Sequence, residues 1–263
     1  MTKITELKYS NTNTYLIQGE NGTLLFDTGW AGTFPAFCKA IGEIGASIQS
    51  IDFILISHFH PDHMGIAQNI ADLGPQIVVA DVQSSYLHVS DGIFSKEKNN
   101  SFIPIKDKQV KTVSIEDSRE FLKMIGINGE LLHTPGHSDD SISLWLDEGM
   151  LFVGDLNPLY ELELHKGTAT EQSWHRLLEM KPVRIYYGHA KTKEMSVPIP
   201  EKPKDLNDLY VLVNQIMRFI DRGLTLEKIT VKTGADESFV EKVARMYLTH
   251  QNIGVQGILD RIM

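Results

Sequence analysis

The stretch SHFHPDHMG, residues 57–65, contains four side chains that commonly bind metal ions: His58, His60, Asp62 and His63. In an extended segment, residues two apart point to the same side, so the imidazoles of His58 and His60 can reach one ion. Pro61 turns the chain, and Asp62 and His63 then face back into the same cavity from the start of a helix. Three histidines and one aspartate exceed what one tetrahedral zinc ion takes from so short a run. The spacing therefore predicts two metal ions that share one site.

Chance is the alternative explanation for this cluster. The chain has ten histidines in 263 residues, so three of them within six positions of a random polar loop is improbable. Further histidines and aspartates follow apolar runs, in GELLHTPGHS (129–138), SISLWLDEGMLFVGDL (141–156) and VRIYYGHA (183–190). In a layered α/β scaffold, the loops after strand ends are where a site is built. We therefore expect distant partners for the first cluster.

Alternating strands and helices are predicted to position these loops. TYLIQG and GTLLFDTG read as a hairpin with its turn at residues 20–22, and IDFILIS (51–57) reads as a strand buried on both faces. QIVVA (76–80) is a further strand. Helical spacing of apolar residues marks 33–45, 65–74 and 171–180. The first 200 residues are therefore predicted to form one mixed α/β domain.

Composition limits the class of protein. An apolar content of 42% and a charged content of 22% are ordinary for a globular chain. The sequence has no apolar run of about 18 residues, which predicts no membrane span, and its start lacks the apolar core of a secretory signal. The single cysteine, Cys38, excludes an internal disulfide and favours a reducing compartment, so we expect a cytoplasmic protein.

The C-terminal part differs in pattern. Residues 198–204 are rich in proline and lysine and read as a linker, so we predict domains at 1–200 and 201–263. Residues 225–250 resemble a helix-turn-helix pair. Its second helix offers little beyond Lys242 and Arg245 for contacts in a DNA groove, which makes it a poor recognition helix. A helical cap is favoured over DNA binding, and its amphipathic helices could form a homodimer contact. The net charge of −9 lies wholly outside residues 201–263, and this acidity makes nucleic acid a less favoured partner than a small molecule.

Five ordered motifs resemble those of the metallo-β-lactamase superfamily. HFHPDH matches its HxHxDH motif, and TPGHS, VGDL and YYGHA follow in order, with LLFDTG upstream. The resemblance covers about residues 8–195. It implies a four-layer αββα sandwich with the metal ions at the edge of its two sheets, followed here by a small helical C-terminal extension.

The resemblance also implies a ligand set. His58, His60 and His137 would bind the first ion, and Asp62, His63 and His189 the second. Asp155 would bridge both ions together with a water or hydroxide, so Asp62 and Asp155 count as catalytic as well as metal-binding. Imidazole and carboxylate ligands without thiolate suit Zn²⁺ best, with Fe or Mn²⁺ as alternatives.

Other polar residues near these motifs receive lesser roles. Asp27 is expected to accept a hydrogen bond from a metal-bound histidine, and His133 to support the site from a preceding strand. Tyr160 and His165 follow Asp155, where members of this superfamily often carry loops that contact substrate or protonate the leaving group. Both are therefore candidate catalytic residues.

These features predict a dinuclear metal-dependent hydrolase in which a bridging hydroxide attacks a small ester, thioester or lactone. An aspartate at position 155, where β-lactamases of this fold usually have cysteine, disfavours β-lactams. TPGHSDDSISLWL resembles a branch with small endoribonucleases, so a phosphodiesterase or ribonuclease remains an alternative. A DNA-binding regulator with a metal sensor is the non-enzyme alternative.

Overall fold

The structure, a computed structural model, describes residues 2–195, 204–249 and 254–262. The chain divides into two compact units, residues 1–196 and 197–263. The boundary predicted between residues 200 and 201 falls outside the described residues. None of the helices in the described part of the chain combines the length and apolar character that a bilayer crossing needs.

The first sheet carries the motif HFHPDH at one of its edges. Within the described residues it has six strands in sequence order, antiparallel from β1 to β3 and parallel from β3 to β6. They are β1 (Lys3–Leu7), β2 (Thr14–Gln18), β3 (Thr23–Phe26), β4 (Phe53–Leu55), β5 (Gln76–Ala80) and β6 (Val110–Val113). The sequence predicts the hairpin and the two following strands but not β6, whose four residues, VKTV, form no continuous apolar run.

The second sheet supplies the distant motifs. Its described strands lie in the order β11-β10-β9-β8-β7, and only β9 and β10 are parallel. They are β7 (Gly129–His133), β8 (Ile142–Leu146), β9 (Met150–Phe152), β10 (Arg184–Tyr186) and β11 (Lys193–Glu194).

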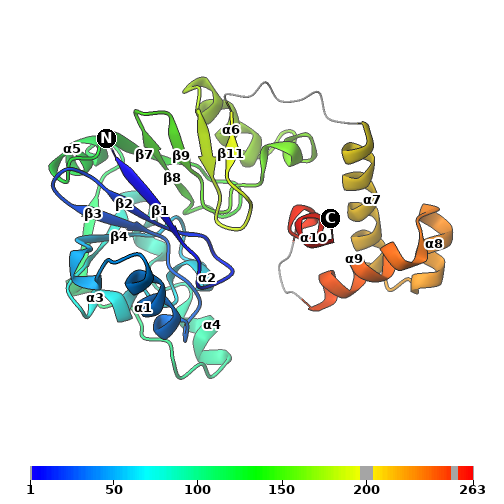
Figure 1. Ribbon diagram of the computed structural model, residues 1–263, viewed down its shortest axis with the longest axis horizontal. Helices are drawn as coiled ribbons and strands as arrows, with labels where there is room; N and C mark the ends of the chain where they lie inside the picture. Colours follow the sequence, from blue (N-terminus) through cyan, green and yellow to red (C-terminus); the bar gives the residue numbers. More distant parts are fainter. Residues whose placement is uncertain (1, 196–203, 250–253, 263) are drawn as a thin grey trace. The chain divides into compact units, whose positions relative to one another are not determined.

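Three apolar clusters show how the layers pack. Alternate residues of the first sheet, such as Leu25 and Ile54, face a cluster that contains Phe37 and Ile41 of α1 (Phe34–Glu43) and Ile70 of α3 (Ala67–Ala71). The opposite face of that sheet packs against the second sheet, and the outer face of the second sheet packs against α6 (Ala169–Glu179). The order is helix, sheet, sheet, helix (Figure 1). The predicted αββα sandwich is confirmed.

Shorter elements complete the first unit. They are η1 (Ile48–Ser50), α2 (Pro61–Met64), η2 (Asp81–Tyr86), α4 (Asp91–Lys96), η3 (Asp107–Gln109), α5 (Ser118–Met124) and η4 (Leu159–His165). The helix predicted over 65–74 is shorter than expected, because α2 ends at Met64 and α3 begins only at Ala67.

Parallel pairing brings the predicted site loops together. Because β3 and β4 are parallel neighbours, the residues that follow them leave the sheet at the same edge. The same holds for β9 and β10, whose extensions stay joined by a hydrogen bond of 2.6 Å from the Gly188 N–H to the Gly154 carbonyl. A bond of 2.8 Å from the Ile142 N–H to the Ser57 carbonyl connects the two sheets at this edge.

The second unit is helical, as predicted for the C-terminal extension. Its described helices are α7 (Lys204–Asp221), α8 (Leu226–Thr233), α9 (Glu237–Thr249) and α10 (Val255–Ile262). They enclose their own apolar cluster, which includes Val213, Ile229 and Val240. Gly234 ends α8 in the left-handed conformation, at φ 65°, where a side chain would be strained.

Replacing Phe152 with alanine tests the core between the two sheets. Phe152 is fully buried and packs against Tyr15, Phe26 and Tyr186. We expect the free energy of unfolding to fall by about 3–5 kcal/mol. All three tryptophans lie within residues 1–196, so tryptophan fluorescence during urea unfolding reports this unit alone. Met124→Ala, at a side chain 57% exposed, is the control and should change stability by less than about 0.5 kcal/mol. Equal effects of the two substitutions would contradict this packing.

Candidate metal centre

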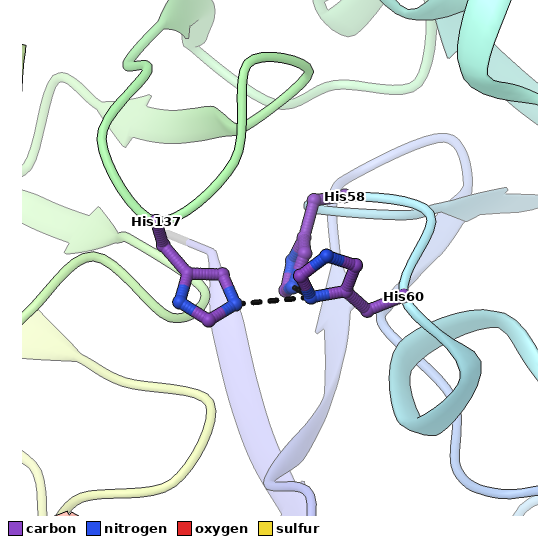
Figure 2. Close-up of side chains that lie close together, drawn as sticks. All are labelled: His58, His60 and His137. Atoms are coloured by element: carbon purple, nitrogen blue, oxygen red, sulfur yellow. Dashed lines mark hydrogen bonds between the residues drawn. The ribbon is translucent and has the colours of Figure 1, made fainter. Parts of the chain in front are cut away.

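Three imidazoles from two loops form the first group of candidate ligands. His58 and His60 follow β4, and His137 lies in the loop between β7 and β8 (Figure 2). Nδ1 of His60 is 3.0 Å from Nε2 of His58 and 3.0 Å from Nε2 of His137. Two nitrogens bound at about 2.0–2.1 Å to one tetrahedral ion lie about 3.3 Å apart, so this group needs little adjustment to enclose a metal ion.

A second group lies beside the first. His63 and Asp62 come from α2, and His189 follows β10. Nε2 of His189 lies 3.0 Å from Oδ2 of Asp62, and Nε2 of His63 lies 3.9 Å from the same oxygen. These three ligand atoms lie close enough together to hold one metal ion.

Asp155, which follows β9, lies between the two groups. Its Oδ2 is 3.3 Å from Nε2 of His189 in the second group, and 3.6 Å and 4.0 Å from Nε2 of His137 and His58 in the first. Its Oδ1 is 3.2 Å from Nε2 of His63. The structure thus brings together all seven side chains that the sequence proposed as ligands.

Two buried atoms in this cluster lack a hydrogen-bond partner in the described part of the chain. They are Nε2 of His63 and Oδ1 of Asp155. A buried polar atom without a partner is costly, and a cation between a neutral imidazole and a carboxylate would satisfy both. The donor set therefore fits divalent metal ions.

Carboxylate and carbonyl oxygens orient the imidazoles. Nδ1 of His63 donates to Oδ2 of Asp27 at 2.9 Å, and Nδ1 of His189 donates to the carbonyl of Asn11 at 3.0 Å. Each bond leaves Nε2 free to face the centre. Asp27 is fully buried and also accepts from the N–H and hydroxyl of Ser57 at 2.6 and 2.8 Å. The structure thus places Asp27 where the sequence expected it, bonded to the imidazole of His63, a candidate ligand.

Burial and nearby charges shift the pKa values of four imidazoles, two downwards and two upwards. Burial is the main cause that holds the pKa of His58 well below its ordinary value, and it also lowers the pKa of His137. Burial acts in the same direction on His63 and His189, but nearby carboxylates, Asp155 foremost, outweigh it. The pKa of His63 is raised well above its ordinary value, and that of His189 is raised to about 10.

His133 and His165, which the sequence also predicted, belong to neither group among the described residues. Nε2 of His133 donates to the carbonyl of Asp139 at 2.8 Å, which braces the loop that carries His137. Nε2 of His165 lies 3.9 Å from Oε2 of Glu161, and His165 belongs to none of the metal-binding groups found among the described residues. Tyr160 lies within η4, but its side chain is outside the described part of the structure.

The loop between β1 and β2 is a supporting segment that the sequence did not reveal. The hydroxyl of Thr12 donates to the carbonyl of Asp62 at 2.7 Å. The side-chain amide of Asn13 donates to the carbonyls of Tyr187 and Ala190 at 2.9 Å each, on both sides of His189. Small polar residues in a loop carry no metal-ligand signal, so only their position near the second group identifies this role.

A cluster of imidazoles and carboxylates at the edge of an αββα sandwich is a candidate metal site of the kind that supports metal-assisted hydrolysis. The family model described as the metallo-beta-lactamase superfamily matches residues 8–189, which is more than half of the chain. The chain therefore belongs to the metallo-beta-lactamase superfamily, and the resemblance predicted from its motifs is confirmed.

The chain is also similar to individual proteins, among them two relatives and one solved structure with the following identity and coverage. Over 216 residues, the chain is 29% identical to the beta-lactamase-like protein 2 homolog of Drosophila melanogaster, covering 79% of this chain and 68% of that protein. It is 31% identical over 252 residues to the atrochrysone carboxyl ACP thioesterase of Aspergillus fumigatus, covering 94% of this chain but 47% of that protein. A metallo-beta-lactamase family protein from Thermus thermophilus has a similar fold, with a TM-score of 0.51 and 18% identity over 97% of this chain and 96% of that one.

Gly188→Ala tests the tight packing around Asp155. A Cβ at position 188 would collide with Oδ1 of Asp155 and come within 2.9 Å of Cε1 of His63. We expect the bound metal per chain, measured by elemental analysis after dialysis, to fall by at least half. Gly42→Ala adds the same methyl group where nothing lies within 4 Å, and it should retain the wild-type metal content. Full metal content in Gly188→Ala would show that Asp155 and His63 are not needed in these positions.

Metal binding should release protons at neutral pH. Since the pKa values of His63 and His189 are raised, both imidazoles carry a proton at pH 7 in the metal-free protein and must lose it to become ligands. We expect about two protons per chain, measured by calorimetry in buffers of different ionisation enthalpy, and tighter binding as pH rises. Without metal, the stabilisation from these two protonated imidazoles is full below about pH 6.5 and is lost as pH rises through their raised pKa values, which for His189 is about 10. A binding heat that is independent of the buffer would contradict this assignment.

Proposed function

We propose that this protein is a dinuclear metal-dependent hydrolase that cleaves a small ester, thioester or lactone, and that its ions are zinc. One observation carries the proposal. Asp155 lies between an all-imidazole group and a mixed group, within 4.0 Å of ligand atoms in both. A carboxylate in this position can be shared by two ions, and the unpartnered Oδ1 supports such a role.

Each group would hold one ion. His58, His60 and His137 would hold the first, Asp62, His63 and His189 the second, and Asp155 would contact both. Two divalent ions bound there supply a Lewis acid for the carbonyl oxygen and a water activated for attack near neutral pH. No serine or cysteine nucleophile is then required.

The chain's own residues prepare the site for this chemistry. Asp27 and the Asn11 carbonyl hold the Nδ1–H tautomers of His63 and His189, so the Nε2 lone pairs face inwards. The side chains of His137 and His189 are 32% and 36% exposed, whereas His58 and His63 are buried. Substrate would therefore approach from the side of His137 and His189.

A thioester is the favoured substrate class. Its support is the Aspergillus fumigatus relative, a protein named as a thioesterase, which aligns with 94% of this chain at 31% identity. The aligned part includes the metal-binding motifs. Because it is only 47% of that protein, it supports the thioester class but no particular acyl group.

The single cysteine supports a cytoplasmic location.

A substrate panel with the zinc-loaded full chain tests this proposal. We expect turnover of an acyl thioester, with weaker turnover of a lactone and of bis-p-nitrophenyl phosphate. His58→Ala should lower kcat/KM for the thioester by at least about 100-fold, because losing a ligand costs more than losing one of its supporting bonds. The measurement is release of free thiol.

His175→Ala is the matched control. His175 is exposed on α6, and its ring lies 4.0 Å from the carboxylate of Glu171 on the same helix. This variant should keep wild-type kcat/KM. Turnover of the phosphodiester faster than that of every ester tested would instead favour the phosphodiesterase alternative.

A further inference from the structure

The loop between β7 and β8 carries a buried carboxylate as well as His137. Asp140 is only 3% exposed. Its Oδ2 accepts a hydrogen bond from the Phe59 N–H at 2.7 Å, and its Oδ1 accepts one from the Ser138 hydroxyl at 2.6 Å. Phe59 lies between His58 and His60, and Ser138 directly follows His137. One carboxylate therefore joins the two chain segments that supply the first imidazole group.

This connection matters because the two segments belong to different sheets. His58 and His60 follow β4 of the first sheet, while the loop of His137 joins β7 and β8 of the second. The spacing of 3.0 Å between His60 and His137 therefore depends on how the sheets are held together at this edge. Asp140 bonds the residue between His58 and His60 and the residue after His137, and it acts beside the Ile142–Ser57 backbone bond, which holds the residue before His58.

Other buried side chains make the connection rigid. The amide of Gln83, which is fully buried, donates to the carbonyl of Asp140 at 3.1 Å and to that of Ile56 at 3.1 Å. The hydroxyl of Ser90 donates to the carbonyl of Phe59 at 2.5 Å. Both polar groups of the Phe59 backbone are thus held by side chains, the N–H by Asp140 and the C=O by Ser90.

We propose that Asp140 is a positioning residue that sets the spacing between His137 and the His58–His60 segment and so determines the metal affinity of the first group. Asp140 acts through the backbone and contacts neither metal nor substrate. The inference rests on the proposed two-ion site. Residues that support metal ligands in this way typically contribute about 10–100-fold to metal affinity.

Zinc titration of the metal-free full chain, in competition with a chromophoric chelator, tests the proposal. We expect Asp140→Ala to weaken one of two zinc equivalents by about 10–100-fold and to leave the other nearly unchanged. Asp139→Ala removes the same charge one position earlier from a side chain that is not buried, and it should bind zinc as the wild type does. Asp140→Asn can accept from Phe59 and donate to Ser138, so it should restore most of the affinity.

Two further backgrounds assign the affected ion. His189→Ala removes a member of the second group, and the effect of Asp140→Ala should persist there. His137→Ala removes a member of the first group, and the effect should disappear. If Asp140→Ala does not fold, Ser138→Ala, which removes one of the two bonds, should weaken the same equivalent to a smaller degree.

The two failures are distinguishable. A wild-type chain that binds no zinc would overturn the proposed function itself. A wild-type chain that binds two zinc ions, with Asp140→Ala and Asp139→Ala indistinguishable from it, would overturn the positioning role alone.

Discussion

The burial of ionisable groups close to one another is the constraint on which this structure depends. Five imidazoles and two carboxylates converge within a few ångströms, and burial penalises the charged forms of the least exposed among them, such as His58 and Asp155. Such a cluster can persist only if the backbone around it is held firmly and if opposite charges are interleaved. Asp155 meets the second requirement, because His63 and His189 keep its pKa well below the ordinary value despite burial.

The first requirement is met by side chains that bind the backbone of the HFHPDH motif from outside. The hydroxyl of Thr12 holds the Asp62 carbonyl, that of Thr28 holds the His63 carbonyl at 2.8 Å, and that of Ser90 holds the Phe59 carbonyl. These donors come from three separate loops. The motif leaves the sheet after Leu55, so its peptide groups lack strand neighbours and these hydroxyls satisfy them instead.

The difference between the candidate ligand side chains and the groups that hold the backbone around them explains what the sequence could predict. Histidines at fixed spacing carry a chemical signal, so His58, His137 and His189 could be proposed from motifs alone. The apolar runs predicted a mixed α/β domain, and the family resemblance of the motifs implied the sandwich. Asn11 contributes only its carbonyl, and Asp140 and Gln83 act on backbone atoms far away in the chain. Such roles depend on tertiary position and leave no pattern in the sequence. Strand β6 could not be predicted for a related reason, since its pairing with β5 defines it and its four residues, VKTV, form no continuous apolar run.

The order of the ligands along the chain has a consequence for biosynthesis. All three imidazoles of the first group have been made at residue 137, before Asp140 and β8, whereas the second group needs residue 189, and Asp155 falls between them. A nascent chain therefore contains a complete imidazole triad before the carboxylate that separates the two groups exists.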